Sequence, residues 1–166
     1  HMKGIYIVLC TILLSCPVFA QEYALELYDW FSVGDTVYLS NGGHLRESGS
    51  RNAKSIAKLS SATSLIINGE PTEARETIYN LSGKYYPVKY FNEKGTFYGY
   101  VWQGLLAKAT ARGREGNLFL YGWKSFNPDN NILTYTLTRV AEGEQKLEVV
   151  WSDTISYHTS YEAKVL

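Results

Sequence analysis

Two alternating runs of residues around a glycine-containing loop constrain the fold of this chain more than any other feature. Residues 84–107 read KYYPVKYFNEKGTFYGYVWQGLLA, in which an arm over 85–91 and an arm over 96–103 flank the loop 92–95. Alternating side chains in both arms, with Gly in the connection, predict a β-hairpin. Pro87 has no backbone N–H, so it requires a sheet edge, a bulge or a position whose N–H is unused.

The rest of the chain also has the pattern of short strands between turn residues. No sustained helical period occurs from residue 32 onward, and residues 21–33 predict either a short helix or a lead-in strand. The stretch 72–82 predicts a strand over 77–81, after a helical turn or as an arm of a hairpin. The fold class is therefore mostly β. The other predicted strands are TVYLS, HLRESGS, SIAKLSS and TSLIIN before the hairpin, and NLFLYGWKSF, NILTYTLTRV and the stretch 146–166 after it.

The N-terminal segment predicts export. His1-Met2 is typical of a cloning remnant, and Lys3 then precedes an apolar core too short to span a bilayer permanently. Val18-Phe19-Ala20 suits cleavage before Gln21, so residues 1–20 are a tag remnant and a signal peptide. The alternative is a buried N-terminal helix or strand. We expect a periplasmic or secreted protein.

The two cysteines, Cys10 and Cys16, both lie in this leader. A mature chain that starts at Gln21 therefore has neither a disulfide nor a thiol nucleophile. The sequence around Cys16, Leu-Leu-Ser-Cys, also resembles a lipoprotein signal, and acylation of Cys16 is the one route by which we expect membrane attachment.

Residues 34–108 resemble a bacterial SH3 (SH3b) domain of exported, Bacteroidetes-type proteins. The resemblance depends on LRESGSRNAKSIAKLSSATSLII, and on KYYPVKY followed by GYVWQGLLA. It implies a small SH3-like β-barrel that acts as a binding module for cell-wall peptides. The chain departs from the family in the stretch NGEPTEARETIYNLSG, which lengthens a loop or adds a hairpin.

Two further segments follow the predicted barrel. The polar stretch 109–116, ATARGREG, predicts a linker, and residues 117–166 predict a smaller C-terminal β unit. The last strand-like residues allow three interpretations. They close a sheet, they belong to an incomplete unit, or their open edge pairs with another molecule, including a second copy of this chain.

Aromatic residues make up 14% of the chain, with 14 Tyr and 4 Trp. Such rings either fill a core or form flat platforms for peptides and sugars, and alternation alone does not assign which rings face outward. At the barrel mouth we expect the aromatic rings to stack on a ligand, and Arg46 either to hold a carboxylate or to form an ion pair or pack its stem on the barrel. The candidate ligand-binding residues are Tyr38, Arg46, Tyr85, Tyr86, Tyr98, Tyr100 and Trp102.

The sequence lacks the residue patterns that are typical of catalytic, metal-binding or nucleic-acid-binding sites. The charges balance at 16 basic against 16 acidic residues, which does not suit a nucleic-acid binder. His44 and His158 are far apart in sequence, and no nucleophile motif or phosphate-binding loop occurs. We therefore expect a protein that is not an enzyme and that uses neither a metal nor another cofactor.

The sequence thus predicts an exported binding module that recognises cell-wall peptide or glycan in the periplasm or envelope. The alternative is an envelope protein that binds another protein, as an inhibitor, an immunity protein or an assembly subunit. That partner would contact the insertion over residues 69–83 or the edge of the C-terminal strand.

Overall fold

The computed structural model describes residues 23–28, 31–113, 115–142 and 147–158. In this part of the chain the regular structure is β-strand apart from one 3-10 turn, so the predicted mostly-β class is confirmed. No helix among these residues is long and apolar enough to cross a membrane. The predicted leader, including Cys10 and Cys16, lies outside the described residues. The elements are β1 (Leu25–Glu26), β2 (Thr36–Tyr38), β3 (Gly43–Arg46), β4 (Ser55–Leu59), β5 (Ser64–Ile67), β6 (Glu76–Ile78), β7 (Leu81–Gly83), β8 (Tyr85–Asn92), β9 (Gly95–Trp102), η1 (Gln103–Leu105), β10 (Ala109–Arg112), β11 (Leu118–Asn127), β12 (Ile132–Glu142) and β13 (Leu147–His158).

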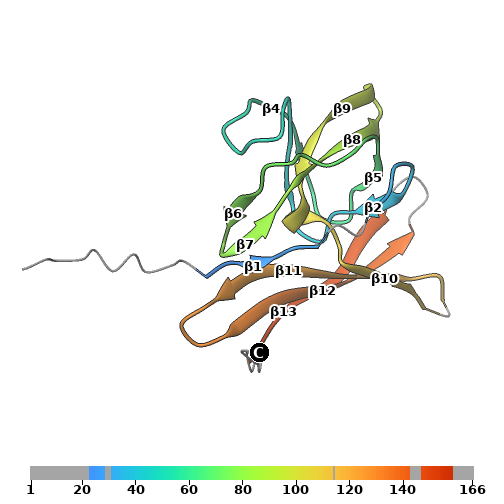
Figure 1. The fold of residues 1–166 in the computed structure, drawn as a ribbon. Coiled ribbons are helices and arrows are strands. Elements are labelled where there is room, and N and C mark those ends of the chain that lie inside the picture. Colours follow the sequence, from blue (N-terminus) through green and yellow to red (C-terminus); the bar gives the residue numbers. More distant parts are fainter. Residues whose placement is uncertain (1–22, 29–30, 114, 143–146, 159–166) are drawn as a thin grey trace, which may run out of the picture.

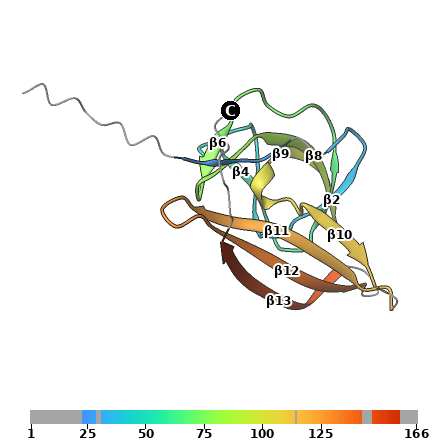
Figure 2. The same cartoon turned by 60° about the horizontal axis from the view of Figure 1, so that its bottom comes forward.

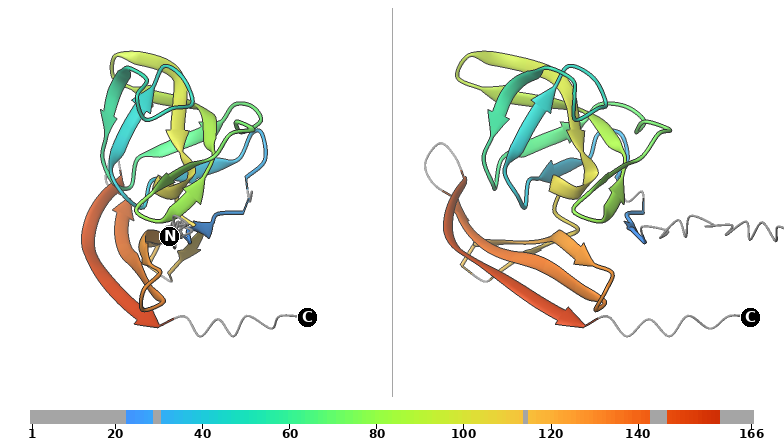
Figure 3. Two further views of the ribbon diagram at one scale, coloured as in Figure 1. Left: turned by 60° about the vertical axis from the view of Figure 1, so that its left-hand side comes forward. Right: turned by 90° about the vertical axis from the view of Figure 1, so that its left-hand side faces the viewer.

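Six strands form one antiparallel sheet in the order β2-β5-β8-β9-β3-β4. This sheet curls around its own core (Figures 1 and 3). The predicted hairpin is present as β8–β9. The last residue pair between β5 and β8 is Ile67–Val88, and Pro87 follows it at the end of β5. The Pro87 carbonyl accepts the Asn68 N–H. Because β5 ends here, it has no residue that needs the backbone N–H that Pro87 lacks.

The insertion predicted as a longer loop or a hairpin is a hairpin. Strands β6 and β7 pair antiparallel, and the two residues between them, Tyr79 and Asn80, have φ of 53° and 59°. Positive φ at both central residues is the conformation of a tight hairpin turn that matches the twist of its strands. The lead-in segment supplies β1, which pairs parallel to β7, so the strand alternative holds there.

The C-terminal unit is a four-stranded antiparallel sheet in the order β10-β11-β12-β13. The predicted linker 109–116 is wrong for its first four residues, because Ala109–Arg112 form β10 and pair with β11. All four side chains of β10 are exposed, and such a strand has no hydrophobic alternation that would predict it.

The C-terminal sheet lies under the curled sheet and the small β1-β7-β6 sheet (Figure 2). One buried cluster crosses this junction, since Trp102 of β9 and Leu81 of β7 pack with Phe126 and Leu133 of the lower sheet. Gln103 of η1 joins the segment before β8 to the segment after β1. It is fully buried, its Oε1 accepts the Lys84 N–H at 3.1 Å, and its Nε2 donates to the Tyr28 carbonyl.

Candidate functional site

The register of the β8–β9 hairpin divides its residues between two faces. Residues directly opposite each other in an antiparallel pair project to the same face, and successive residues alternate. The inner face carries the pairs Tyr86–Val101, Val88–Gly99 and Tyr90–Phe97, and the outer face carries Tyr85–Trp102, Pro87–Tyr100, Lys89–Tyr98 and Phe91–Thr96.

The inner face fills the core of the curled sheet. Tyr86 is fully buried, and its ring meets that of Phe31 edge to face at 5.5 Å between centroids. Gly99 allows β3 to approach closely, because a Cβ there would lie 2.6 Å from the Arg46 carbonyl oxygen. Tyr86 therefore presents no ring face to solvent, and its predicted ligand contact finds no support in its position.

The outer face is covered where the hairpin begins and ends. Tyr85 and Trp102 are 2% and 4% exposed, under the β6–β7 hairpin and the C-terminal sheet. The Tyr85 hydroxyl donates to Glu76 Oε2 at 2.8 Å, and the Trp102 indole N–H donates to the Glu76 carbonyl at 3.3 Å. Burial and the adjacent Glu76 carboxylate raise the pKa of Tyr85 well above its usual value. These two predicted ligand residues act as a structural anchor.

The outer face is open toward the hairpin tip. Tyr98 is 58% exposed and Phe91 is 51% exposed. The Lys89 amine lies between them, 4.8 Å from the Phe91 ring centroid and 6.0 Å from that of Tyr98. At these distances a cation is attracted to the ring faces, so Lys89 contacts both rings.

Tyr100 and Arg46 continue this surface toward the covered end. They are directly opposite in the β3–β9 pair and thus share the outer face, and both are half-buried. One guanidinium nitrogen of Arg46 donates to the Ala53 carbonyl at 2.7 Å, which fixes the side chain beside the β3–β4 loop. We call the residues Phe91, Tyr98, Tyr100, Lys89 and Arg46 the outer aromatic strip.

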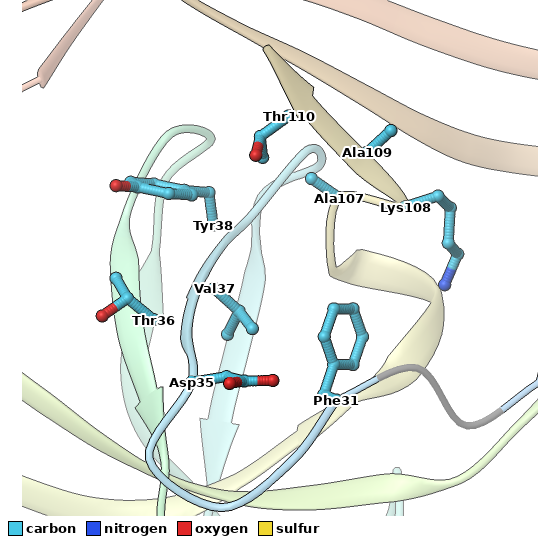
Figure 4. A pocket seen from close by; sticks show the side chains of 9 residues that line it. All are labelled: Phe31, Asp35, Thr36, Val37, Tyr38, Ala107, Lys108, Ala109 and Thr110. Atoms are coloured by element: carbon cyan, nitrogen blue, oxygen red, sulfur yellow. The ribbon is translucent and has the colours of Figure 1, made fainter. Parts of the chain in front are cut away.

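Tyr38 lies elsewhere, beside a cleft between β2 and β10 (Figure 4). The cleft has a volume of about 180 Å³, less than the roughly 300–1,000 Å³ of usual small-molecule pockets. The structure thus groups three predicted residues, Arg46, Tyr98 and Tyr100, in the strip and separates Tyr38 from them. The sequence prediction did not include Lys89 and Phe91. The available signal was alternation, because residues 87, 89 and 91 of one strand project to the same face.

The described residues contain no group of three or more His, Cys, Asp or Glu side chains that could hold a metal ion. His44 is exposed and shares a hydrogen bond of 2.8 Å with Ser55. Glu76, one of three acidic residues in the insertion, accepts hydrogen bonds from Tyr85 and from the Arg51 backbone N–H, which is a structural role. The arrangement of the strip is suited to binding, through ring faces and cations.

Comparison of the chain with protein-family models, curated proteins and solved structures gives no match.

Proposed function

We propose that this chain is an exported, non-catalytic binding module whose outer aromatic strip holds an extended peptide or glycan of the cell wall. The observation that carries the proposal is that Tyr98 and Phe91, both on the outer face and each more than half exposed, lie within about 6 Å of the same Lys89 amine. Large rings are usually buried, so two adjacent exposed rings on one face indicate a contact surface.

The chemistry of the strip suits such a ligand. Flat aromatic faces stack on sugar rings and on peptide groups, and they do so at low cost in conformational entropy. Lys89 and Arg46 are cations beside these rings, and they would pair with the free carboxylates of a wall peptide. A strip on a sheet face presents an open surface along which an extended chain can lie.

The proposal includes the fold family. The segment that resembles the SH3b opening forms β3 at Gly43–Arg46, and the aromatic hairpin is followed by the short turn η1, in the order the resemblance implies. Such a domain, after a leader with a signal-peptidase pattern, acts in the periplasm or envelope.

Retention of the full chain on purified peptidoglycan tests the proposal. We expect Tyr98→Ala to lower retention at least tenfold, because the ring forms the largest exposed part of the strip. Tyr79→Ala is the matched control, since Tyr79 is 72% exposed but lies at the β6–β7 turn, away from the strip. No retention of the unaltered protein, or equal retention of both variants, would contradict the proposal.

A second candidate function is recognition of an envelope protein through the β6–β7 hairpin, because Tyr79 projects from its turn with a 72% exposed side chain. The same two variants separate the candidates. Loss of a purified envelope partner with Tyr79→Ala but not with Tyr98→Ala would favour this function.

A further inference from the structure

The six-stranded sheet carries charge of one sign. Its strands β2, β3, β4, β5, β8 and β9, all within the described residues, contain no Asp or Glu. The β8–β9 loop adds one residue of each sign, Glu93 and Lys94. The whole chain is balanced at 16 basic against 16 acidic residues, so the acidic residues lie outside these strands and the sheet is locally positive. The basic residues of the strands are His44, Arg46, Lys58 and Lys89.

All four basic residues project to the outer face of the sheet. Leu45, between His44 and Arg46, is fully buried in the core of the curled sheet, so its two neighbours point outward. Lys58 is directly opposite His44 and shares its face, and Lys89 is on the outer face of the hairpin. The basic residues therefore follow a diagonal across this face, from β8 past β9 to β3 and β4.

Acidic residues near the sheet do not neutralise this diagonal. Among the described residues the one ion pair joins Lys54 and Glu47, at 3.2 Å, in the loop between β3 and β4. Arg46 instead donates to the neutral Ala53 carbonyl, and the Glu76 carboxylate at the covered end of the face accepts hydrogen bonds within the structural anchor. The positive charge of the outer face is therefore not compensated by a carboxylate in ion-pair contact.

A ligand on the outer face meets side chains rather than backbone. Strand N–H and C=O groups point toward neighbouring strands, within the sheet, whereas side chains stand roughly perpendicular to it. Polypeptides that bind a sheet gain affinity from main-chain hydrogen bonds at an edge, which a face does not provide. A sugar ring needs no such bonds, because it stacks on an aromatic ring such as Tyr98 or Phe91. The outer aromatic strip is thus better suited to a glycan than to a peptide.

The spacing of the basic residues favours a polymer with several charges. Lys89 is opposite Tyr98, and Arg46 is opposite Tyr100 on the other side of β9. Two strand spacings and two residues along the strand separate Lys89 from Arg46, which is roughly 12 Å between their Cα atoms. One carboxylate does not pair with both side chains at this separation, whereas a polymer with a carboxylate on each sugar pairs with them together.

We propose that the ligand of the outer aromatic strip is an acidic glycan, whose sugar rings carry carboxylates. The sugar rings stack on Tyr98 and Phe91, and the carboxylates accept charge-assisted hydrogen bonds from Lys89 and Arg46. Lys58 extends the site beyond the strip to β4. This inference rests on the proposed function, because it uses the same surface, and it specifies the chemical class of the ligand.

Calorimetric titration of the full chain with an oligogalacturonate tests the inference, because this linear oligomer has one carboxylate on each sugar. The matched control is its methyl ester, which keeps the sugar rings and removes the charge. We expect the acid to bind at least tenfold more tightly than the ester. We also expect this advantage to shrink as NaCl is raised from about 0.05 to 0.5 M, because salt screens exposed charges.

Two lysine variants assign the charge effect to the strip. Lys89→Met keeps an unbranched apolar stem and removes the charge, so we expect at least a tenfold loss of affinity for the acid and none for the ester. Lys124→Met is the control, because Lys124 is also an exposed lysine of a strand but lies on β11 of the C-terminal sheet. Equal affinities of the two variants for the acid would overturn the inference.

Two other ligands separate this inference from its alternatives. An oligoglutamate with the same number of carboxylates tests the glycan, and the inference is overturned if this peptide binds as tightly as the oligogalacturonate. Peptidoglycan tests the proposed function: if it retains the chain while the acid binds no better than the ester, wall binding stands and the acidic glycan is overturned. If the acid binds with the expected charge dependence and peptidoglycan does not retain the chain, the ligand class stands and its origin in the wall fails.

Discussion

Replacement of Tyr86 and Tyr98 by Ala tests the assignment of the two hairpin faces. Both residues are tyrosines of the same hairpin, but Tyr86 is fully buried and Tyr98 is 58% exposed. Truncation of a buried aromatic side chain costs about 3–5 kcal/mol, because transfer free energy is lost and a cavity remains. An exposed substitution usually changes stability by about 0.5 kcal/mol, and we allow about 1 kcal/mol for the contact of Tyr98 with Lys89.

The difference is large enough for a simple equilibrium assay. At this chain length about 1 kcal/mol corresponds to roughly 2–4 °C in Tm, so Tyr86→Ala is expected to lower Tm by roughly 6–20 °C. Urea unfolding of the full chain, followed by tryptophan fluorescence, gives the free energies directly. Equal losses for the two variants, or a larger loss for Tyr98→Ala, would refute the assigned register and, with it, the outer aromatic strip.

Three further outcomes follow from other contacts. Gly104→Ala is expected to destabilise the fold by more than 2 kcal/mol in urea unfolding, because its Cβ would lie 2.0 Å from the Trp102 ring; an unchanged midpoint would contradict this. Asn80→Ala removes a residue type that tolerates positive φ and removes the hydrogen bond from the Asn80 side chain to the Phe126 carbonyl. We expect the free energy of unfolding in urea to fall by about 1–2 kcal/mol. An unchanged free energy would show that this turn does not stabilise the junction. Burial lowers the pKa of Lys108 to about 7 in the folded chain against 10.5 for the free side chain. The unfolded chain then binds more protons between these values, so stability from this group rises as pH increases from about 7 to 10. Lys108→Met should flatten that rise in urea midpoints measured across the range, and an unaltered pH profile would exclude Lys108 as its source.

The strands themselves follow from local sequence. Alternation of side chains and the Gly95 loop predict the β8–β9 hairpin at nearly its observed bounds, because a strand buries one face and a tight turn needs particular residues. The single strand predicted over 77–81 is wrong, because Tyr79 and Asn80 form a turn between β6 and β7. The β8–β9 hairpin depends on the pattern of neighbouring residues, so it could be inferred without a distant contact.

The tertiary structure decided which rings are reachable. Tyr85, Trp102 and Tyr98 all lie on the outer face of one hairpin, yet only Tyr98 is exposed, because the β6–β7 hairpin and the C-terminal sheet cover the other two. Trp102 is covered by Glu76, Phe126 and Leu133, which are each more than 20 residues away in sequence, so alternation within the hairpin carries no information about this covering.

The edge strand β10 shows the same limit. Its side chains are all exposed, and its place in the sheet depends on backbone hydrogen bonds to β11, which any residue except proline can make. A polar stretch of this kind has the composition of a linker, and only the position of β11 makes it a strand. The sequence by itself determined the mostly-β class and the β8–β9 hairpin, because both follow from local alternation and turn residues. Long-range pairing and burial decided the place of β10 and which surfaces remain exposed.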